Sequence, residues 1–310
     1  MNDAEPILPE QAEEPPFNPW AGLRQKNRFF ENEEVAAIVK RALFYAHAGV
    51  PIHFQGTAGR GKTAVALEIA KRLGRPISVM TGNDWLDAED LVGKQVGQST
   101  QSVVDKYIQR VRRSEATTRY DWENAILAEA MVHGHTLVYD EFTRSNAKAN
   151  GILLSVLEEG VLVAPDPLAT ADYIQAHPDF RIILTSNPHD YAGVNASPDA
   201  LLDRMVTFQM ARYSRETESG IVAARTGIPA ALAKRIVHLV NDLSQDDTAC
   251  SMRAGILIAQ IAAMRLRSLA LSDALLAQIA ADVLGGRGIA VTTSQIAQYL
   301  AQSPQQEAGT

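Results

Sequence analysis

A short glycine-rich segment carries the residue types best suited to bind phosphate. Its eight positions match the pattern G-x-x-x-x-G-K-[ST] and are Gly56, Thr57, Ala58, Gly59, Arg60, Gly61, Lys62 and Thr63. In this pattern the glycines let backbone N–H groups turn toward an anion, the lysine reaches the β and γ phosphates, and the hydroxyl ligates Mg²⁺. The spacing therefore predicts a phosphate site in which Lys62 acts on the phosphates and Thr63 is a metal ligand.

An acidic pair follows a short apolar segment further along the chain. Asp140 and Glu141 come directly after residues 136–139, which have the pattern of a buried strand. An open α/β sheet places its ligand crevice at the carboxyl ends of its strands. We expect Asp140 to belong to the Mg²⁺ shell, directly or through water, and Glu141 to activate the attacking water as a general base. Acidic pairs after strands are also common in solvated loops, so this interpretation depends on the phosphate segment upstream.

Three further side chains complete the predicted catalytic set. Asn187 ends the apolar segment 181–186 and is expected to bind the γ phosphate or the lytic water, unless it only starts a turn before Pro188. Arg204 follows at the distance expected of an arginine finger, which offers a planar cation to transition-state charge; a finger acting in trans would leave an isolated subunit incomplete. Arg253 comes just after the start of a later helix in the second domain. Contact between Arg253 and the nucleotide would couple the ligand state to the angle between the two domains. A surface salt bridge is the alternative for each arginine.

The elements that must position these side chains alternate between strands and helices. Apolar spacing predicts strands over 50–54, 76–80, 136–139 and 181–186, and helices over 33–49, 62–73, 102–113, 122–132 and 148–158. Such alternation implies parallel crossover units and an α/β sheet with helices on both faces. The phosphate segment then lies between a strand and a helix, which argues against an ordinary glycine-rich turn.

Beyond about residue 211 the strand patterns stop. Helix signals there predict segments over 216–225 and 229–243, followed by helices that begin at Ser251, at Ser272 and near Ser294. The chain is therefore expected to contain an acidic, proline-rich arm over 1–30, an α/β nucleotide-binding domain over 31–212, a small all-helical lid domain over 213–302 and a tail over 303–310.

Composition excludes several classes of protein. The chain has 310 residues, of which 46% are hydrophobic and 21% charged, as in an ordinary globular protein, and its net charge is −7. That charge argues against a protein whose main work is to coat nucleic acid or an anionic lipid membrane. Residues 1–35 alone hold eight acidic and three basic side chains. The arm also carries four aromatic residues, Phe17, Trp20, Phe29 and Phe30, so docking on a neighbouring surface and an extended arm both stay open.

Cysteine content and the first residues bear on location. The single cysteine, Cys250, has no partner for an intrachain disulfide, which is consistent with a reducing compartment. No apolar run approaches the roughly 18 residues of a membrane-spanning helix, and the N-terminal segment is acidic where a secretory signal would be basic and then apolar. A cytoplasmic location is expected.

The motifs, in this order and followed by a helical lid, resemble those of the AAA+ ATPases and, within them, the MoxR-type branch. The narrower resemblance is to the gas vesicle protein N family. It rests on DEFTRS at 140–145, LLSVLEEG at 153–160, HPDFR at 177–181, TSNP at 185–188 and YAGV at 191–194. The usual loop of the superfamily, Gly-Pro-x-Gly-Thr-Gly-Lys-Thr, differs here at Thr57 and Arg60. Neither change removes a backbone donor.

This resemblance implies a P-loop NTPase fold and a Mg²⁺-dependent ATPase that takes part in forming or enlarging gas vesicles by acting on their shell proteins. It further implies self-association into a ring, expected to be a hexamer, in which Arg204 acts in trans. Gas vesicle shell or accessory proteins are the implied partners, and association with gas vesicles the implied location.

Two other functions fit the same motifs. One is a MoxR-type chaperone ATPase that activates a metalloenzyme or another partner, and the other is a nucleotide-binding structural component of the vesicle with little turnover. A nucleic-acid motor fits least, because residues 211–310 hold nine basic against eight acidic side chains and no basic stripe interleaved with aromatic residues.

The MoxR-type pattern has an insertion before the acidic-pair strand and a hairpin before the asparagine strand. Residues 90–113 and 161–177 occupy these places. The helix expected over 102–113 carries an apolar stripe that consists of Val103, Val104, Tyr107, Ile108 and Val111. Core packing is the simplest interpretation of that stripe, and a face that contacts substrate or lines a ring is the alternative.

Overall fold

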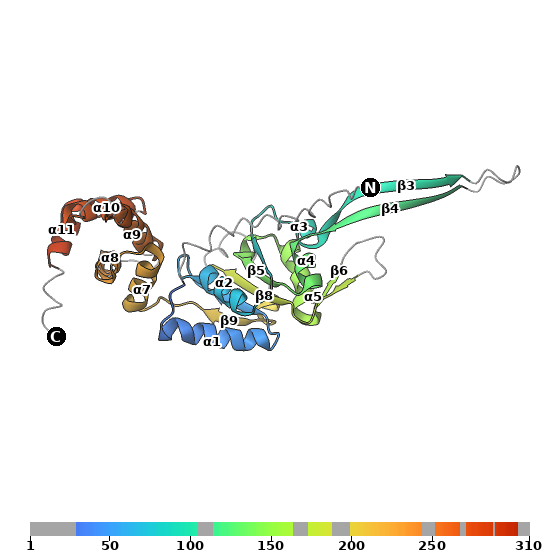
Figure 1. The fold of residues 1–310 in the computed structure, drawn as a ribbon, viewed down its shortest axis with the longest axis horizontal. Coiled ribbons are helices and arrows are strands. Elements are labelled where there is room, and N and C mark those ends of the chain that lie inside the picture. The colour runs from blue at the N-terminus through green and yellow to red at the C-terminus, as the bar shows by residue number, and fades with distance from the viewer. Residues whose placement is uncertain are drawn as a thin grey trace, which may run out of the picture.

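The computed structural model describes residues 29–104, 114–163, 173–187, 199–243, 252–266, 271–287 and 289–302. Most of the predicted arm and the whole predicted tail lie outside these residues. The described chain forms an α/β body followed by a bundle of helices, with the bundle at one end of the molecule (Figure 1).

A parallel sheet of five strands forms the centre of the body. Its strands are β2 (Ile77–Thr81), β5 (Thr136–Asp140), β8 (Arg181–Ser186), β1 (Ile52–Gln55) and β9 (Val206–Gln209), in that spatial order. All neighbouring pairs are parallel. The four predicted strands are confirmed, whereas β9 was not anticipated.

Helices cover both faces of this sheet, as predicted. Four longer helices do so, namely α1 (Glu33–His47), α2 (Lys62–Arg72), α4 (Ile126–His133) and α5 (Ala147–Glu159), and two short ones are α3 (Ala88–Val92) and α6 (Asp199–Leu202). Successive strand residues point to opposite faces. Leu137 and Tyr139 accordingly pack in one core with α4 and α5, whereas Val138 packs in the other core with α1 and α2.

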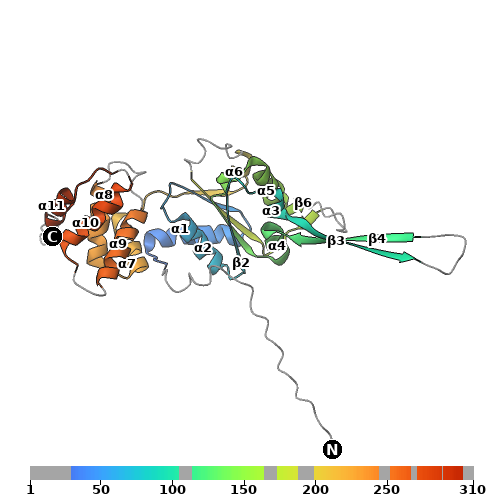
Figure 2. The ribbon, with the colours of Figure 1, turned by 90° about the horizontal axis from the view of Figure 1, so that it is seen from above.

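The segment between α3 and α4 contradicts the expected helix over 102–113. Strands β3 (Gly93–Val104) and β4 (Ser114–Asn124) pair in an antiparallel hairpin instead, and residues 105–113 lie outside the described part. The hairpin projects from the body at the end away from the helical bundle (Figure 2). The prediction of a helix over 102–113 was wrong because it rested on the apolar spacing alone. Segments 98–104 and 114–120 are rich in Thr, Ser and Val, and β-branched residues favour strands.

Two smaller corrections follow from the same hairpin. The helix expected over 122–132 begins only at Ile126, because Trp122 belongs to β4. The apolar stripe is divided, since Val103 and Val104 are strand residues and its other three members lie outside the described residues. A second hairpin, β6 (Val161–Val163) with β7 (Tyr173–Gln175), lies where one was expected.

Five helices form the C-terminal bundle around a core of their own. They are α7 (Arg215–Thr226), α8 (Ala230–Leu243), α9 (Met252–Leu266), α10 (Asp273–Gly285) and α11 (Thr293–Gln302). The Ser272 side chain caps α10 as expected, whereas Ser251 lies outside the described residues. In the described ranges no helix is both long enough and apolar enough to cross a membrane.

The start of the described chain ties the body to the bundle. Phe29 packs against the core formed by α1 and α2. The Phe30 ring lies so close to Gly220 of α7 that a β-carbon there would come within 2.1 Å of it. Asn32 adds a hydrogen bond of 2.6 Å from its amide to the Thr217 hydroxyl. The last two aromatic residues of the predicted arm are therefore docked, while Phe17 and Trp20 lie outside the described residues.

Candidate active site

The carboxyl ends of three neighbouring strands bring the predicted residues together. Strand β1 runs into the phosphate loop at Gly56, β5 ends at Asp140, and β8 is followed by Asn187. Gln55 is in register with Ser186. Because the strands are parallel and in register, the loop, the acidic pair and Asn187 share one edge of the sheet. Asn187 is half-buried there.

The phosphate loop has the backbone that its glycines predict. Gly59 and Gly61 have φ values of 83° and 80°, in the left-handed region that favours glycine. Gly61 is the N-cap of α2, and no side chain caps this helix. Gly56 is required for a different reason, because a β-carbon there would lie 2.8 Å from the Met210 carbonyl oxygen. The loop therefore presents the positive end of a helix to an anion.

Both cations of the loop are held inside it. The Lys62 ammonium donates to the carbonyl oxygens of Gly56, at 2.7 Å, and Thr57, at 3.0 Å. Arg60 is only 7% exposed, and its Nε donates to the Thr57 hydroxyl at 3.0 Å. Arg60 thus does not extend into solvent, and two positive charges line the loop.

A hydroxyl and a carboxylate meet beside the loop. The Thr63 hydroxyl, in the first turn of α2, donates to Asp140 Oδ1 at 2.7 Å. Oxygen donors of this kind suit Mg²⁺, which is commonly held by one or two protein ligands together with substrate phosphates and water. Across the described ranges no group of three or more His, Cys, Asp or Glu side chains could form an all-protein cage for a metal. The residues present fit a Mg²⁺–nucleotide complex.

Thr185 joins this group, although no sequence pattern singled it out. Its hydroxyl donates to Asp140 Oδ1 at 2.5 Å and accepts the Glu141 backbone N–H at 3.0 Å. The residue is completely buried on the central strand β8. It thus orients the carboxylate of one acidic residue and the backbone of the other. A polar side chain directly after the apolar run 182–184 and two residues before Asn187 was the available signal.

We expect Thr185→Val to lower ATP turnover about 10- to 100-fold and to destabilise the fold by about 1–3 kcal/mol. Valine has nearly the same shape but leaves the Glu141 N–H and one Asp140 lone pair unmatched in a buried place. Phosphate release and urea unfolding measure the two effects. Thr185→Ser, which keeps the hydroxyl, is the matched control and should stay near wild type. Wild-type turnover in the valine variant would contradict the assignment.

Glu141 has a strained backbone at the edge of the site. Its φ and ψ are 52° and 41°, and no other non-glycine residue in the described ranges has a positive φ. Its carbonyl lies where a β-carbon on Gly82 would be only 2.3 Å away. Arg144 Nη1 donates to Glu141 Oε2 at 2.7 Å. Strain of this kind persists where the surroundings over-determine a conformation, and it clusters at functional sites.

A buried histidine supports the strands beneath the loop. His53 is completely buried, with Nε2 2.8 Å from the Ser186 hydroxyl and Nδ1 3.0 Å from the Thr207 hydroxyl. Burial, aided by the charge of Lys62, lowers the pKa of His53 to about 4. A neutral imidazole therefore links β1, β8 and β9 at neutral pH. Sequence reasoning did not single out this residue.

Arg204 does not lie at this edge. It precedes β9, whose first residue, Val206, is in register with Ile52, so Arg204 lies at the opposite, amino edge of the sheet. Strand length alone separates the two edges by on the order of 15 Å. The guanidinium bonds Glu158 through Nε and Nη2, at 2.9 and 2.6 Å, which is the intramolecular salt bridge foreseen as the alternative.

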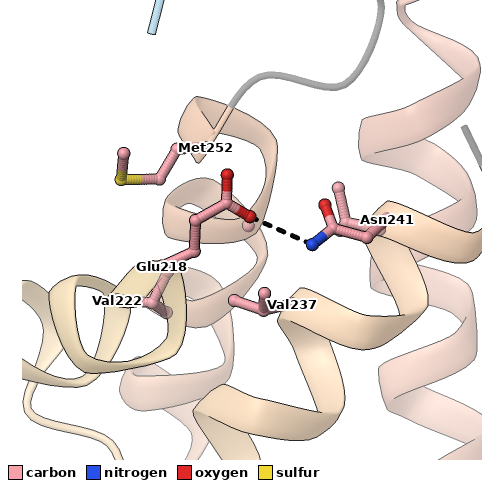
Figure 3. A pocket seen from close by; sticks show the side chains of 7 residues that line it. Glu218, Val222, Val237, Asn241 and Met252 are labelled. Carbon is pink, nitrogen blue, oxygen red and sulfur yellow. Dashed lines mark hydrogen bonds between the residues drawn. The ribbon is translucent and has the colours of Figure 1, made fainter. Parts of the chain in front are cut away.

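Arg253 lies on the bundle, as the second residue of α9, and is exposed. Its neighbour Met252 packs against the bundle core and against the core of α1 and α2. The Met252 side chain also lines a cavity of about 10 Å³ together with Glu218 (Figure 3). Within this lining, the Asn241 amide donates to the Glu218 carboxylate at 3.0 Å. The start of α9 therefore lies where the bundle meets the nucleotide-binding body.

Several known proteins are similar in sequence to this chain over most of the chain's length. Residues 51–205 match the model of the AAA domain (dynein-related subfamily). The protein named gas vesicle ATPase GvpN from Ancylobacter aquaticus is 42% identical over 270 residues, which cover 85% of this chain and 75% of that protein. Its namesake from Haloferax mediterranei is 39% identical, covering 77% and 69%. A MoxR-type protein, CbbQ of Hydrogenophilus thermoluteolus, is 25% identical, covering 61% and 64%.

A solved structure shares the fold at much lower identity. The RuvB Holliday junction branch migration motor of Thermotoga maritima aligns with a TM-score of 0.51 and 18% sequence identity, and the alignment covers 84% of this chain and 72% of that one. Likeness at this level shows a common AAA+ architecture.

Proposed function

Since the chain belongs to the gas vesicle ATPases, a family of AAA+ proteins that hydrolyse ATP, we propose that it uses ATP hydrolysis to form and enlarge gas vesicles. The observation that supports this most is a phosphate loop joined to an acidic pair by the 2.7 Å bond between Thr63 and Asp140, in a chain 42% identical to a gas vesicle ATPase. We further propose that the protein acts on gas vesicle shell or accessory proteins. It would do so in the cytoplasm, in association with the vesicles.

The geometry suggests a role for each residue at the carboxyl edge. The loop N–H groups and Lys62 bind the phosphates of ATP, and Lys62 exchanges its carbonyl acceptors for phosphate oxygens. Thr63 and Asp140 would hold Mg²⁺, which supplies positive charge against the phosphate oxygens. Glu141 takes the proton of the attacking water, while Asn187 orients that water or the γ phosphate.

Arg204 fits a role in trans. At the amino edge of the sheet it is too far from its own phosphate loop to contact the nucleotide there, and the AAA+ family generally forms rings. In a ring, we propose, Arg204 of one subunit reaches the ATP of its neighbour and stabilises transition-state charge. A hexamer is the proposed size. Arg253, at the meeting of bundle and body, would contact nucleotide from the lid side.

Two other functions share the same site. A MoxR-type chaperone acting on a metalloenzyme is supported by the likeness to CbbQ, but the 25% identity there is well below the 42% to the gas vesicle ATPase. A structural vesicle component without turnover would need neither Glu141 nor an arginine finger. The presence of Glu141 next to Asp140, and of Arg204 where it could act in trans, therefore supports the active ATPase.

Gene deletion in the host, followed by complementation, tests the proposal. We expect the deletion strain to lose gas vesicles and buoyancy, the wild-type gene to restore them, and Lys62→Ala not to. Lys71→Ala, on the same helix but 76% exposed at its side chain, is the matched control and should restore them. Vesicles formed with Lys62→Ala would favour the structural component. Normal vesicles in the deletion strain, with loss of a metalloenzyme activity, would favour the chaperone.

A further inference from the structure

The candidate finger is clamped within its own subunit by two neighbouring elements. Nε and Nη2 of Arg204 both donate to one oxygen of Glu158, at 2.9 and 2.6 Å, and Nη1 donates to the Ala200 carbonyl at 2.6 Å. These bonds use three of the five N–H groups of the guanidinium, and they come from Nε and both terminal nitrogens. The plane and direction of the group are therefore defined.

We propose that Glu158 is a positioning residue that orients Arg204 for the nucleotide bound to the neighbouring subunit. The inference rests on the trans role of Arg204 in the proposed function and adds the residue that makes this role efficient. An arginine side chain is long and flexible, so a finger that is already oriented loses less freedom when it meets the transition state. Glu158 would never touch the nucleotide itself.

The helix that carries Glu158 is anchored to the body by hydrogen bonds near its start. It is the second-last residue of α5, a helix whose start is held by the Asn146 side chain, which accepts the Ala149 N–H at 2.8 Å and donates to the Leu86 carbonyl at 2.7 Å. One turn on, the buried Asn150 amide donates to the Phe142 carbonyl at 3.0 Å. The helix is thus anchored to the turn that follows the acidic pair, and its far end holds the finger.

Stability alone explains this pair poorly. The Glu158 side chain is 57% exposed and that of Arg204 is 29% exposed, and exposed ion pairs contribute little to folding. If the pair serves only the surface, removing the carboxylate should change nothing. If it orients the finger, removal should slow turnover without weakening ATP binding, because the loop and Lys62 of the neighbouring subunit bind the phosphates, whereas the finger stabilises charge that develops in the transition state.

Steady-state kinetics of the full-length protein separates these cases. We expect Arg204→Ala to lower kcat at least about 100-fold and Glu158→Ala to lower it about tenfold, with KM for ATP within about twofold of wild type in both. Glu158→Gln keeps an acceptor oxygen and should recover to within about threefold of wild type. Glu159→Ala, which removes the adjacent exposed glutamate of α5, is the matched control and should match wild type.

Mixing subunits shows whether the defect lies in the finger. A Glu141→Gln subunit has an inactive site but an intact finger, so adding it should restore turnover to Glu158→Ala and to Arg204→Ala subunits alike. Adding a Glu141→Gln/Glu158→Ala double variant should restore much less.

The kinetic and mixing experiments distinguish failure of the Glu158 inference from failure of the trans arrangement. Wild-type kcat in Glu158→Ala, or rescue of Arg204→Ala but not of Glu158→Ala, overturns the inference and leaves the proposed function standing. Wild-type kcat in Arg204→Ala, or rescue of neither, overturns the trans arrangement and the inference with it.

Discussion

We expect Glu141→Gln to lower kcat for ATP hydrolysis at least about 100-fold, while the protein still binds ATP. The amide is nearly the same size as the carboxylate but cannot accept the proton of the attacking water. The contacts that bind the phosphates come from the loop and Lys62 on β1 and α2, and the substitution leaves them unchanged. Loss of the Arg144 partner costs little, because that ion pair is exposed.

Phosphate release and retention of labelled ATP after gel filtration measure the two halves of this result. We expect the variant to retain ATP, not ADP, because hydrolysis and not binding is blocked. Glu159→Gln makes the same chemical change at an exposed position at the end of α5 and should behave as wild type. If Glu141→Gln hydrolysed ATP normally, another group would have to be the base, and the assignment of the acidic pair would be wrong.

We expect Lys62→Ala to weaken nucleotide binding itself. The ammonium is buried among carbonyl oxygens of its own loop, so it already lies where β and γ phosphates would replace those acceptors. Alanine removes the charge and leaves the Gly56 and Thr57 carbonyls without this donor. We expect ATP affinity and kcat each to fall at least about 100-fold, because a charge-assisted bond to phosphate is lost in a sheltered site.

Titration with a fluorescent ATP analogue reports the affinity. Lys71→Ala removes a lysine from the same helix but from an exposed place, so it should bind and hydrolyse ATP as wild type does. Circular dichroism checks that the Lys62 variant is folded. A folded Lys62→Ala variant with unchanged affinity would show that the loop N–H groups alone carry the phosphate site.

Much of the nucleotide-binding edge is predictable because it is encoded locally. The loop needs glycines at set positions and a lysine at the start of a helix, and the acidic pair needs a buried strand before it. These requirements act over a few residues. Eight consecutive positions and two short strands were therefore enough to predict the phosphate loop and the acidic pair. The Ser272 cap of α10 belongs to the same class, and Gly227 ends α7 in the left-handed conformation.

Apolar spacing alone misled where the elements project from the core. Residues 102–113 have apolar side chains at helical intervals, yet residues 102–104 continue a strand paired with 114–116. Periodicity predicts structure because one face must be buried against a core. A hairpin that extends away from the body is under less of that constraint, so strand propensity and cross-strand pairing decide its structure.

The sequence by itself determined the fold class, the phosphate loop, the acidic pair and the strands that precede them, because each depends on neighbours along the chain. Only the tertiary structure decided which distant residues meet. Register in a parallel sheet places Thr185 against Asp140 and moves Arg204 to the opposite edge. Helix α5 then brings Glu158 to Arg204, 46 positions away. Such contacts follow from strand order, register and helix length together, which no local pattern contains.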